Sequence, residues 1–590
     1  MQAIQSLIVT TLMVSPIALS AQIEVLTMPT QSTAITTSFK TTSEDTLQLP
    51  FVDGFAHGLR PEWTNHGVMV NSHWALDALS TDQAVFDGIA ADGQAYLVGT
   101  LPTDSLTDVL LSPYFDLSGL SNVVLSFHLQ QGGKGDPTEV SDTLIVDFLN
   151  PSDSTWHRAW DVPGSAAAEQ WLSAAMVLPV AVVGKQAVRF RLARKGAPGG
   201  AFDHFLIDYL EFAAGRNLAD TLIEDPSWIE IPPSITQVFH ELPWFHYQSA
   251  VVEADSLAMA YRRNGPVPVG GWQLNLGKYQ WVDGNGSVLA SRLSVPVVTN
   301  LQHDIRTPYV MPIAQPNVSP TGPFSWDMTI WFDGENVGER ANDSMRVHQL
   351  FGDRYALDDG HAERTYGVIQ GQSPRMAQRF NFLQSDTLKG VDLAFVPAGY
   401  DWTGMTFQLA IWGIDTLNLP GQLLYLSDSL YQPAIAYPGQ TFAHYVLDTA
   451  GLVVPSVCYI GWIQSTGPAL TMGLDMDHLT TKAYGDVNGW FTSLLPGTLQ
   501  IRPFFRGIPQ DLSAGVSKPS PMAIYPIPST GRLHVEGYDG PWVCMDLQGR
   551  IQCQGKQIEQ GLLHLEALPP GHYILVFRNG IRQQIVTIKP

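Results

Sequence analysis

Short runs of strand-forming residues, each closed by a turn, are the feature of this sequence that most limits its fold. Residues 122–130 and 142–148 alternate apolar and polar side chains, which is the period of a strand with one buried face. The chain also carries 52 Gly and 41 Pro among 590 residues, and both residue types interrupt long helices. We therefore predict an all-β protein built from tandem β-sandwiches.

The spacing of these runs divides the chain into four folded units. We predict a jelly roll at 49–213, an immunoglobulin-like or fibronectin-like sandwich at 225–345, and a second, jelly-roll-like sandwich at 346–506. A small immunoglobulin-like sandwich is predicted at 522–590. Residues 507–521 are rich in Pro, Ser and Gly and are predicted to be a linker.

The N-terminal residues have the composition of an export signal. Residues 1–21 hold a short apolar core followed by Ala18-Leu19-Ser20, a small-x-small cleavage pattern, so we predict a signal peptide. A buried N-terminal strand is the alternative. The Ser/Thr-rich residues 22–48 are predicted to be a flexible leader. No other segment is long and apolar enough for a membrane helix, so no transmembrane segment is predicted in the mature chain.

The last unit carries three separated motifs in a fixed order. They comprise Tyr525, Pro526, Pro528, Ser529, Thr530 and Gly531, then Asp546, Gly549 and Arg550, then Leu568, Pro569, Gly571 and Tyr573. These motifs resemble the C-terminal sorting domain of the type IX secretion system of Bacteroidetes-type bacteria, apart from Ile527, where that family usually has Asn. The resemblance implies that the type IX secretion machinery is a partner. It also implies passage through the periplasm to the outer cell surface or the medium.

Two further regions resemble modules of surface proteins. The segments SPYFDLSGL, LSFHL and FLIDYLEF within 49–213 resemble MAM-like and related anchor-type jelly rolls. The segment DDGHAERTYG, at 358–367, resembles the start of a sandwich found in large type IX-exported surface proteins. Both resemblances imply binding modules on a cell surface, and neither identifies a ligand.

Charge is distributed unevenly along the chain and excludes some partners. The formal net charge is -23, while residues 516–590 hold seven basic and five acidic residues, so the rest of the chain carries -25. Such an acidic body repels nucleic acid and anionic membranes. It is compatible with divalent cations and with neutral polysaccharide, although acidity also keeps an exported protein in solution.

Searches for catalytic motifs predict no catalytic residue. The sequence has no His-Glu-x-x-His helix, no Gly-x-Ser-x-Gly elbow, no phosphate-binding loop and no Cys-x-x-Cys pair. A glycoside hydrolase needs only two carboxylates placed by its fold, so the absence of motifs does not exclude an enzyme.

Closely spaced acids give three candidate metal sites. On a strand, Asp475 and Asp477 would face the same side and could share one hard cation such as Ca²⁺. The other two candidates are Asp358-Asp359 with Glu363, and Asp203 with Asp208. Each also has a structural interpretation, because Asp commonly caps turns by accepting bonds from nearby backbone amides.

The three cysteines give weaker indications. Cys544 and Cys553 face each other across a predicted hairpin, where a disulfide and two free thiols are both compatible with the sequence. Cys458 lies in an apolar run and is predicted to be buried.

A sugar-binding strip would need exposed aromatic residues on one sheet face. Trp156 with Trp160, or Trp326 with Trp331, are candidates, with core packing as the default. His57, His66 and His73 have no ligand spacing and are interpreted as polar loop residues.

The sequence as a whole favours a non-catalytic adhesion, glycan-binding or protein-binding protein of the cell surface. The alternatives are a secreted glycan-acting hydrolase and a structural component of a surface layer.

Overall fold

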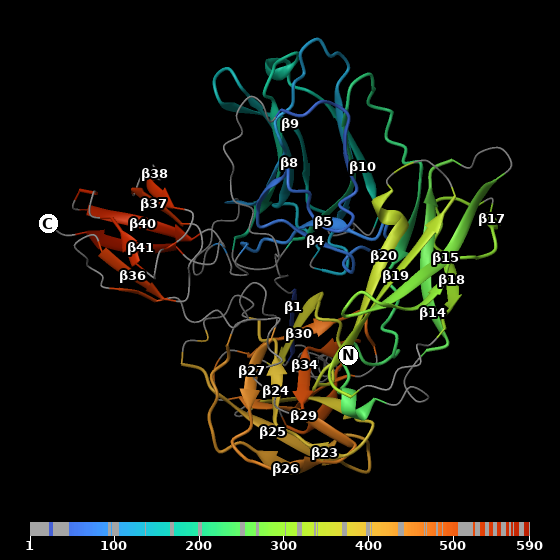
Figure 1. Ribbon diagram of the computed structural model, residues 1–590, viewed down its shortest axis with the longest axis vertical. Coiled ribbons are helices and arrows are strands. Elements are labelled where there is room, and N and C mark those ends of the chain that lie inside the picture. The colour runs from blue at the N-terminus through green and yellow to red at the C-terminus, as the bar shows by residue number, and fades with distance from the viewer. Residues whose placement is uncertain are drawn as a thin grey trace, which may run out of the picture. The chain divides into compact units, whose positions relative to one another are not determined.

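The structure is a computed structural model of the chain, and strands are the main regular structure of its described residues. They comprise 23–27, then 46–505 with gaps at 92–95, 97–104, 136, 166–169, 199–202, 248–253, 267–270, 301, 315–320, 335–337, 339, 369–373, 397–401, 403, 435–441, 465–466, 468, 480–481 and 487, then 523–525, 532–536, 542–546, 551–555, 558, 562–565, 568–569, 571–577 and 583–588. Within these ranges there is no α-helix, and the predicted all-β class of tandem sandwiches is confirmed (Figure 1). The chain divides into two compact units, Met1–Gly507 and Ile508–Pro590.

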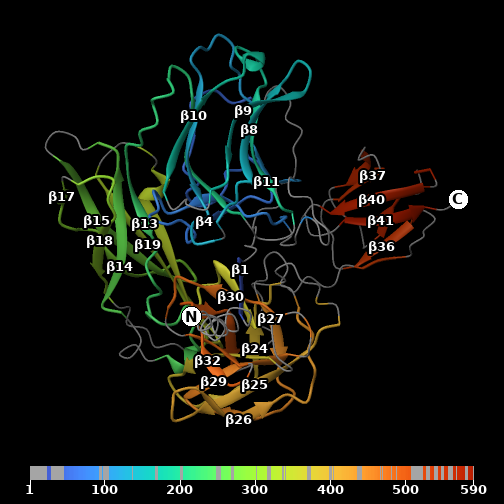
Figure 2. The ribbon, with the colours of Figure 1, turned by 180° about the vertical axis from the view of Figure 1, so that it is seen from behind.

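Two antiparallel sheets form the N-terminal sandwich. The first has the order β10 (Leu172–Val177), β7 (Val124–Gln131), β12 (Phe205–Ala213), β5 (Gln83–Phe86) and β4 (Met69–Asn71), with β2 (Phe51–Asp53) also paired to β12. The second has the order β3 (Thr64–His66), β6 (Ser105–Leu111), β11 (Arg189–Gly196), β8 (Thr143–Asn150) and β9 (Thr155–Pro163). Figures 1 and 2 show β10 on one side of this sandwich and β8 and β9 on the other. A single 3₁₀ turn, η2 (Val180–Val182), leads toward β11.

Aromatic side chains fill the space between these two sheets. Phe115 meets Phe212 edge-on, with ring centroids 5.1 Å apart, and Phe190 meets Phe212 in the same way at 5.4 Å. All three rings are fully buried. The sequence folds this way because β11, β12 and the bridge residue Phe115 each bring a large apolar side chain to the same interior.

The middle region also has two sheets. One has the order β13 (Asp225–Glu230), β14 (Ser256–Asn264) and β18 (Thr307–Pro312). The other has the order β16 (Val288–Arg292), β15 (Trp272–Asp283), β19 (Phe324–Asp333) and β20 (Ser344–Phe351), with β17 (Val298–Asn300) on β15. Two 3₁₀ turns, η3 (Trp244–His246) and η4 (Ala341–Asp343), lie in its connections. Strand β20 pairs with β19 along its whole length, so this sheet continues across the boundary that the sequence placed between 345 and 346.

The third region contains a six-stranded sheet and three smaller ones. The large sheet has the order β26 (Pro420–Leu426), β25 (Phe407–Ile414), β29 (Val457–Gln464), β22 (Arg375–Asn381), β31 (Ala483–Asp486) and β32 (Trp490–Thr492). The smaller ones are β1 (Ile23–Thr27), β21 (Arg364–Val368), β30 (Met472–Asp475) and β33 (Thr498–Leu499), then β27 (Ala443–Val446), β24 (Gly390–Leu393) and β34 (Ile501–Phe504), then β23 (Asp386–Thr387) with β28 (Val453–Val454).

Two parts of the predicted leader are paired in the structure. Strand β1 runs antiparallel to β21, from Ile23 opposite Val368 to Thr27 opposite Arg364. Leu47 forms a bridge to Phe115 of the N-terminal sandwich. The prediction of a flexible leader therefore needs correction at these residues, because their backbone groups find partners on an open strand edge. The predicted signal peptide, 1–21, lies outside the described residues.

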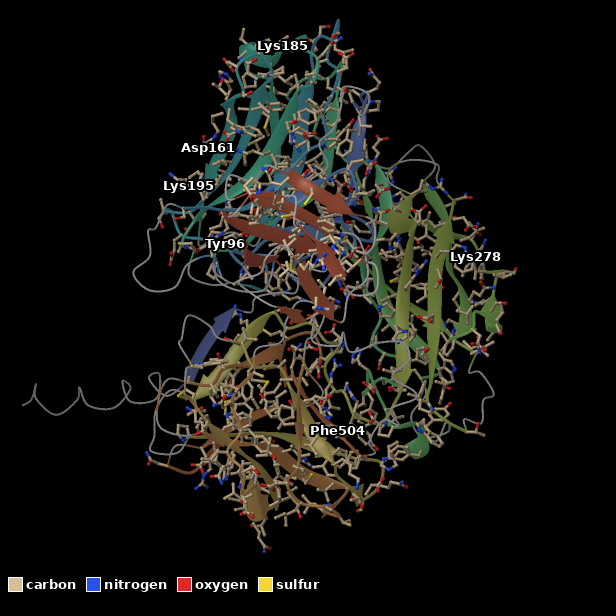
Figure 3. All side chains as sticks on the ribbon, turned by 60° about the vertical axis from the view of Figure 1, so that its left-hand side comes forward. Tyr96, Asp161, Lys185, Lys195, Lys278 and Phe504 are labelled. Carbon is tan, nitrogen blue, oxygen red and sulfur yellow. The ribbon has the colours of Figure 1, made fainter. Side chains whose placement is uncertain are left out.

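One hydrophobic core joins the middle and third regions. The cluster of buried apolar side chains runs without a break from Trp228 to Phe505, and Tyr355 is one of its members at the point where the two regions meet. Figure 3 shows Phe504 inside the third region, whereas Lys185 and Asp161 lie at the surface of the N-terminal sandwich. The N-terminal sandwich keeps a core of its own.

The C-terminal unit is a small pair of sheets. One has the order β35 (Ala523–Tyr525), β36 (Arg532–Glu536) and β39 (Leu562–His564); the other has the order β38 (Ile551–Gly555), β37 (Trp542–Asp546), β40 (Gly571–Phe577) and β41 (Gln583–Ile588). Leu533, Leu563 and Leu575 belong to its core. Across the described part of the whole chain, no helix has the length and apolar composition that crossing a membrane would require.

Candidate functional site

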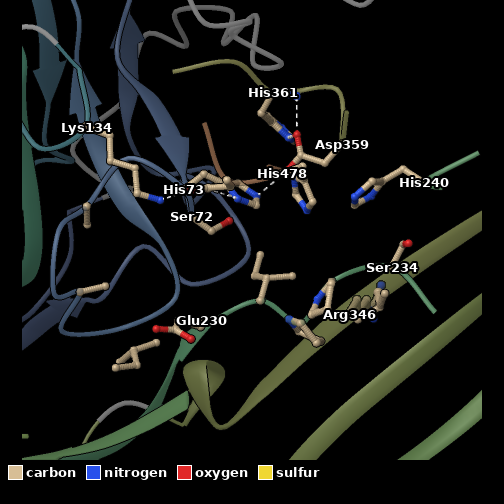
Figure 4. Close-up of a pocket in the computed structure, with 18 of the residues that line it drawn as sticks. Ser72, His73, Lys134, Glu230, Ser234, His240, Arg346, Asp359, His361 and His478 are labelled. Atoms are coloured by element: carbon tan, nitrogen blue, oxygen red, sulfur yellow. Dashed lines mark hydrogen bonds and ion pairs between the residues drawn. The ribbon is translucent and has the colours of Figure 1, made fainter. Parts of the chain in front are cut away.

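A pocket of about 700 Å³ lies in the first unit where three stretches of the chain meet. The N-terminal sandwich contributes Ser72, His73, 75–78 and Lys134, the middle region contributes 229–234 and 346–348, and the third region contributes Asp359, His361, Asp477 and His478. Figure 4 shows His73, Asp359 and His478 converging on one side of the pocket, with Glu230 and Arg346 on the opposite side.

Asp475 ends strand β30 and organises the turn that follows it. Its Oδ1 accepts the backbone N–H groups of Asp477 and His478, both at 2.9 Å, and its Oδ2 accepts the N–H of Asp359 at 3.0 Å. The strand stops at Asp475, so the strand predicted over 475–477 is wrong beyond that residue. The reason is the turn-capping behaviour of Asp, which competes with extended backbone.

The loop before β21 brings a second group of acids to the same place. Asp358 pairs with Arg502, with Nη2 to Oδ1 at 2.6 Å, and accepts the N–H of Gly360 at 3.0 Å. Asp359 accepts the N–H of His361 at 2.7 Å. Glu363 accepts the N–H of Met476 at 2.7 Å and so connects the two loops. Two acidic motifs that the sequence offered as separate candidates thus lie in one site.

His73 reaches this site from the N-terminal sandwich. It follows β4, where Asn71 accepts its backbone N–H at 2.6 Å. Its Nδ1 lies 3.1 Å from Asp477 Oδ2, its Nε2 lies 3.4 Å from Asp359 Oδ2, and its ring stacks on His361 at 5.1 Å. Its interpretation as an ordinary polar loop residue was therefore wrong.

Nothing in the sequence near His73 indicated this role, because its partner Asp477 is 404 residues away. We call the assembled group the histidine–carboxylate cluster: His73, Asp359, His361, Glu363, Asp475, Asp477 and His478.

Opposite charges hold most of this cluster in its ionised forms. Burial works against the charged form of His73, but Asp359 and Asp477 outweigh it and raise its pKa to about 10. Burial also opposes ionisation of Asp359 and Asp477, yet His73 lowers the pKa of both carboxyls, with help from Lys134 at Asp477. Glu363 behaves differently, because burial and the carboxylates of Asp475 and Asp477 raise its pKa well above the usual value.

These shifts give the two carboxyl groups of the pocket wall their anionic form. A general acid needs a carboxyl group whose pKa is raised toward neutrality, so that it holds a proton to give. Asp359 and Asp477 line the pocket with lowered pKa values and therefore remain anionic. Burial lowers the pKa of His240, also in the pocket wall, to about 3, which leaves its imidazole neutral.

The third predicted acid pair does not form one site. Asp203 pairs with Arg194 at 3.0 Å and lies near Glu139 and Asp142. Asp208 instead accepts the hydroxyl of Ser80 at 2.8 Å.

The tryptophan pairs do not form aromatic strips. Trp326 is buried in the core, and Trp331, five residues along the same strand, points to the opposite face. A bulge in β9 separates Trp156 from Trp160, so that Trp160 packs edge-on against Phe127 while Trp156 lies under Arg191.

The other two histidines stay apart from the cluster. His57 Nε2 lies 3.0 Å from the carbonyl oxygen of Ala341, and His66 is exposed on the edge strand β3.

The sorting motifs fall partly within the described residues. Asp546 lies opposite Tyr573 across β37 and β40, and the Tyr573 hydroxyl donates to the carbonyl of Pro569 at 2.8 Å. Tyr525 ends β35, Leu568 packs against the core of the unit, and Gly571 opens β40. Their proposed role in export stays a prediction. The remaining motif residues, Pro526, Pro528, Ser529, Thr530, Gly531, Gly549 and Arg550, lie outside the described residues.

The cysteines occupy the positions that the sequence suggested. Cys544 lies opposite Cys553 across β37 and β38, and both are free thiols in the structure, so the disulfide stays a prediction. Burial raises the pKa of Cys544 to about 12. Cys458 is buried in β29, as expected, and burial raises its pKa to about 12, which suits a packing role.

Comparison with known proteins gives only distant likenesses. No family model matches the sequence, and no curated protein matches it. The K1 cleaved adhesin domain of Lys-gingipain from Porphyromonas gingivalis is 15% identical over 28% of this chain and 99% of that domain, with a TM-score of 0.21. The CBM22-1 xylan-binding domain of Xyn10C from Paenibacillus barcinonensis is 14% identical over 28% of this chain and 94% of that domain, with a TM-score of 0.19.

A third likeness covers more of the chain. The Endo-D glycoside hydrolase domain from Streptococcus pneumoniae is 10% identical over 52% of this chain and 44% of that one, with a TM-score of 0.18. At TM-scores this low, none of the three identifies the activity or the ligand of this chain.

Proposed function

We propose that this protein is an exported, non-catalytic binding protein that holds a neutral glycan in the pocket of its first unit. One observation carries the proposal: a cavity of about 700 Å³ forms where three stretches of the chain meet, and its walls offer unused donors. Ligand pockets commonly measure roughly 300–1,000 Å³ and lie where domains or elements meet.

Arg346 supplies the clearest unused donors. Its side chain is exposed at the pocket, and within the described part of the chain its guanidinium has no hydrogen-bond or ion-pair partner. Arg306, another lining residue, is already engaged by Glu230 through Nη2 to Oε2 at 2.8 Å. A guanidinium presents several donors in one plane, which suits neighbouring hydroxyl groups of a sugar.

An apolar part of the pocket wall also favours a saccharide. Ala78 and Ile229 form a small apolar cluster that borders the pocket, next to Pro232 and Pro233. A sugar ring has both hydroxyl groups and an apolar C–H face, so it can use donors and small apolar side chains together. The net charge of -23 favours a neutral glycan over an acidic one.

A glycan-array screen with the full-length protein tests this proposal. We expect reproducible binding to a defined set of neutral glycans and a loss of at least about tenfold in affinity for Arg346→Ala, which is about 1.4 kcal/mol. Arg158→Ala is the matched control, because Arg158 is a half-exposed arginine on β9 that pairs with Asp147. Unchanged binding by Arg346→Ala would place the ligand elsewhere. Release of reducing ends from a bound glycan would support the hydrolase alternative instead.

The export route is a separate part of the proposal, supported by the three C-terminal motifs and by the compactness of the unit that carries them. Deleting residues 516–590 from the full chain in a bacterium with type IX export should leave the protein in the periplasm. Surface display of the truncated chain would contradict a sorting role for this unit.

A further inference from the structure

The histidine–carboxylate cluster has more negative charge than its permanent cations balance. Five of the acids in and beside it, Asp358, Asp359, Glu363, Asp475 and Asp477, have side chains that are at least three-quarters buried. In the described part of the chain, Arg502 pairs with Asp358 and Lys134 pairs with Asp477. Three carboxylates are left for imidazoles, protons or a bound cation to balance.

The nitrogen atoms around Asp359 stand away from its oxygens. His73 Nε2 lies 3.4 Å from Oδ2 and His361 Nδ1 lies 3.6 Å from Oδ1, whereas His478 Nδ1 is hydrogen-bonded to Asp475 Oδ2 at 2.9 Å. Charge-assisted hydrogen bonds between these groups would measure about 2.7–2.9 Å. Two ligand atoms about 2.0–2.1 Å from a tetrahedral Zn²⁺ stand about 3.3 Å apart. The spacing around Asp359 is therefore closer to that of a shared ion than to that of direct bonds.

The other nitrogen of His73 has a partner that suits metal binding. Its Nδ1 lies 3.1 Å from Asp477 Oδ2, and Asp477 is itself held by Lys134. A carboxylate that accepts a hydrogen bond from one imidazole nitrogen fixes the tautomer and leaves the other nitrogen as a ligand. In this arrangement Nε2 is the nitrogen that faces Asp359, and a bound metal ion would replace its proton, which leaves to solvent.

We propose that His73, Asp359 and His361 bind a Zn²⁺ ion, with Asp477 orienting His73 from outside the coordination shell. The three ligand atoms lie within 4.8 Å of one another. Two imidazoles and one carboxylate are the donors that Zn²⁺ prefers, whereas Ca²⁺ takes oxygen ligands almost entirely. All three residues line the pocket, so the remaining coordination position faces it.

This assignment differs from the Ca²⁺ site predicted at Asp475 and Asp477. Backbone amides and His478 occupy the two oxygens of Asp475, and His73 and Lys134 occupy those of Asp477. Neither carboxylate has an oxygen left without a donor. The zinc site would also connect the N-terminal sandwich to the third region, since His73 belongs to the sandwich and Asp359 to the third region. It would exist whether or not the pocket binds a glycan.

Calorimetric titration of the full-length protein, freed of metal by a chelator, tests the site. We expect one Zn²⁺ to bind per chain and Ca²⁺ to bind at least a hundredfold more weakly. His73→Gln and His361→Gln should each reduce Zn²⁺ affinity more than tenfold, and Asp477→Asn should reduce it 10–100-fold. The matched control is His348→Gln, because His348 is a pocket histidine that pairs with Asp327 instead.

Two further measurements keep the test decisive. Thermal unfolding of each metal-free variant checks that it is folded, and His361 is half-exposed, so its substitution should leave the fold intact. Co²⁺ in place of Zn²⁺ should give the visible absorption of a tetrahedral site in the wild type and lose it in His361→Gln. The proposal is overturned if the wild type takes up no stoichiometric Zn²⁺, if Ca²⁺ binds more tightly, or if the histidine variants bind Zn²⁺ as the wild type does.

Discussion

Two buried polar groups in the first unit differ in how closely their nitrogen donors approach the carboxylates. In the N-terminal sandwich, Arg194 is fully buried and its guanidinium donates to Asp203 at 3.0 Å, to Thr107 at 2.9 Å and to the carbonyl of Ala197 at 3.1 Å. In the histidine–carboxylate cluster, carboxylates outnumber the permanent cations and imidazole nitrogens stand off from Asp359. The first group is suited to fixing a fold. The second faces a pocket and is suited to receiving a ligand.

Removing the buried Arg194 guanidinium should have the largest effect on stability. Arg194→Met leaves Asp203 buried without its partner, and we expect a loss of about 3–5 kcal/mol in the free energy of unfolding of the N-terminal sandwich. Denaturant titration, with hydrogen exchange of β6 and β11 amides as the local measure, gives this value. The control Arg158→Met removes a half-exposed arginine, and its partner Asp147 keeps Arg191, so the loss should be less than about 1 kcal/mol. Equal losses in the two variants would remove the distinction between the groups.

His128, for which the described residues supply no carboxylate partner, sharpens the contrast with His73. Burial lowers the pKa of His128 in β7 to about 4, below its value of 6.5 in an unfolded chain. As the pH falls, His128 takes up a proton in the unfolded chain at a higher pH than in the folded chain. The folded state therefore has its full stability above pH 6.5 and loses stability as the pH falls toward 4. The loss reaches about 3 kcal/mol.

The variant His128→Gln isolates the part of the acid-induced loss of stability that comes from protonation of His128. Between pH 7 and pH 4 it should lose about 3 kcal/mol less stability than the wild type, measured by denaturant titration at each pH. His66→Gln, at an exposed histidine of the same sandwich, should follow the wild-type curve. Parallel curves for the wild type and His128→Gln would show that His128 is protonated in the folded sandwich.

The smallest expected effect is an increase in the free energy of unfolding. Glu363→Gln replaces a carboxyl group whose ionisation is opposed by burial and by the neighbouring carboxylates, and it keeps an oxygen for the N–H of Met476. We expect it to raise the free energy of unfolding at pH 8 by about 1 kcal/mol when a chelator is present, because like-charge repulsion falls. Asp161→Asn, at an exposed acid, should change stability by less than about 0.5 kcal/mol. A clear loss of stability in Glu363→Gln would show that its negative charge is already balanced.

Part of the site could be predicted from sequence and part could not. Asp475 with Asp477, and Asp358-Asp359 with Glu363, were recognisable as local acidic motifs, and Cys544 could be placed opposite Cys553 from hairpin geometry alone. Their turn-capping role was also foreseeable, because it depends on bonds between residues two or three positions apart.

Contacts between distant loops could not be foreseen. Asp359 meets Asp475 across 116 residues, and His73 meets Asp477 across 404 residues. Loops that end different strands have no common period, so no pattern in the sequence relates them. The same reason explains why β20 was divided between two predicted domains, since its partner β19 determines where it belongs.

The sequence by itself determined the all-β class, because strand period and turn residues act over a few positions and do not depend on what lies far along the chain. Only the tertiary structure decided that two acidic turns and a histidine from another sandwich form one site. Packing of whole sandwiches sets those distances, and a change in how the sandwiches dock would separate the residues without altering any local motif.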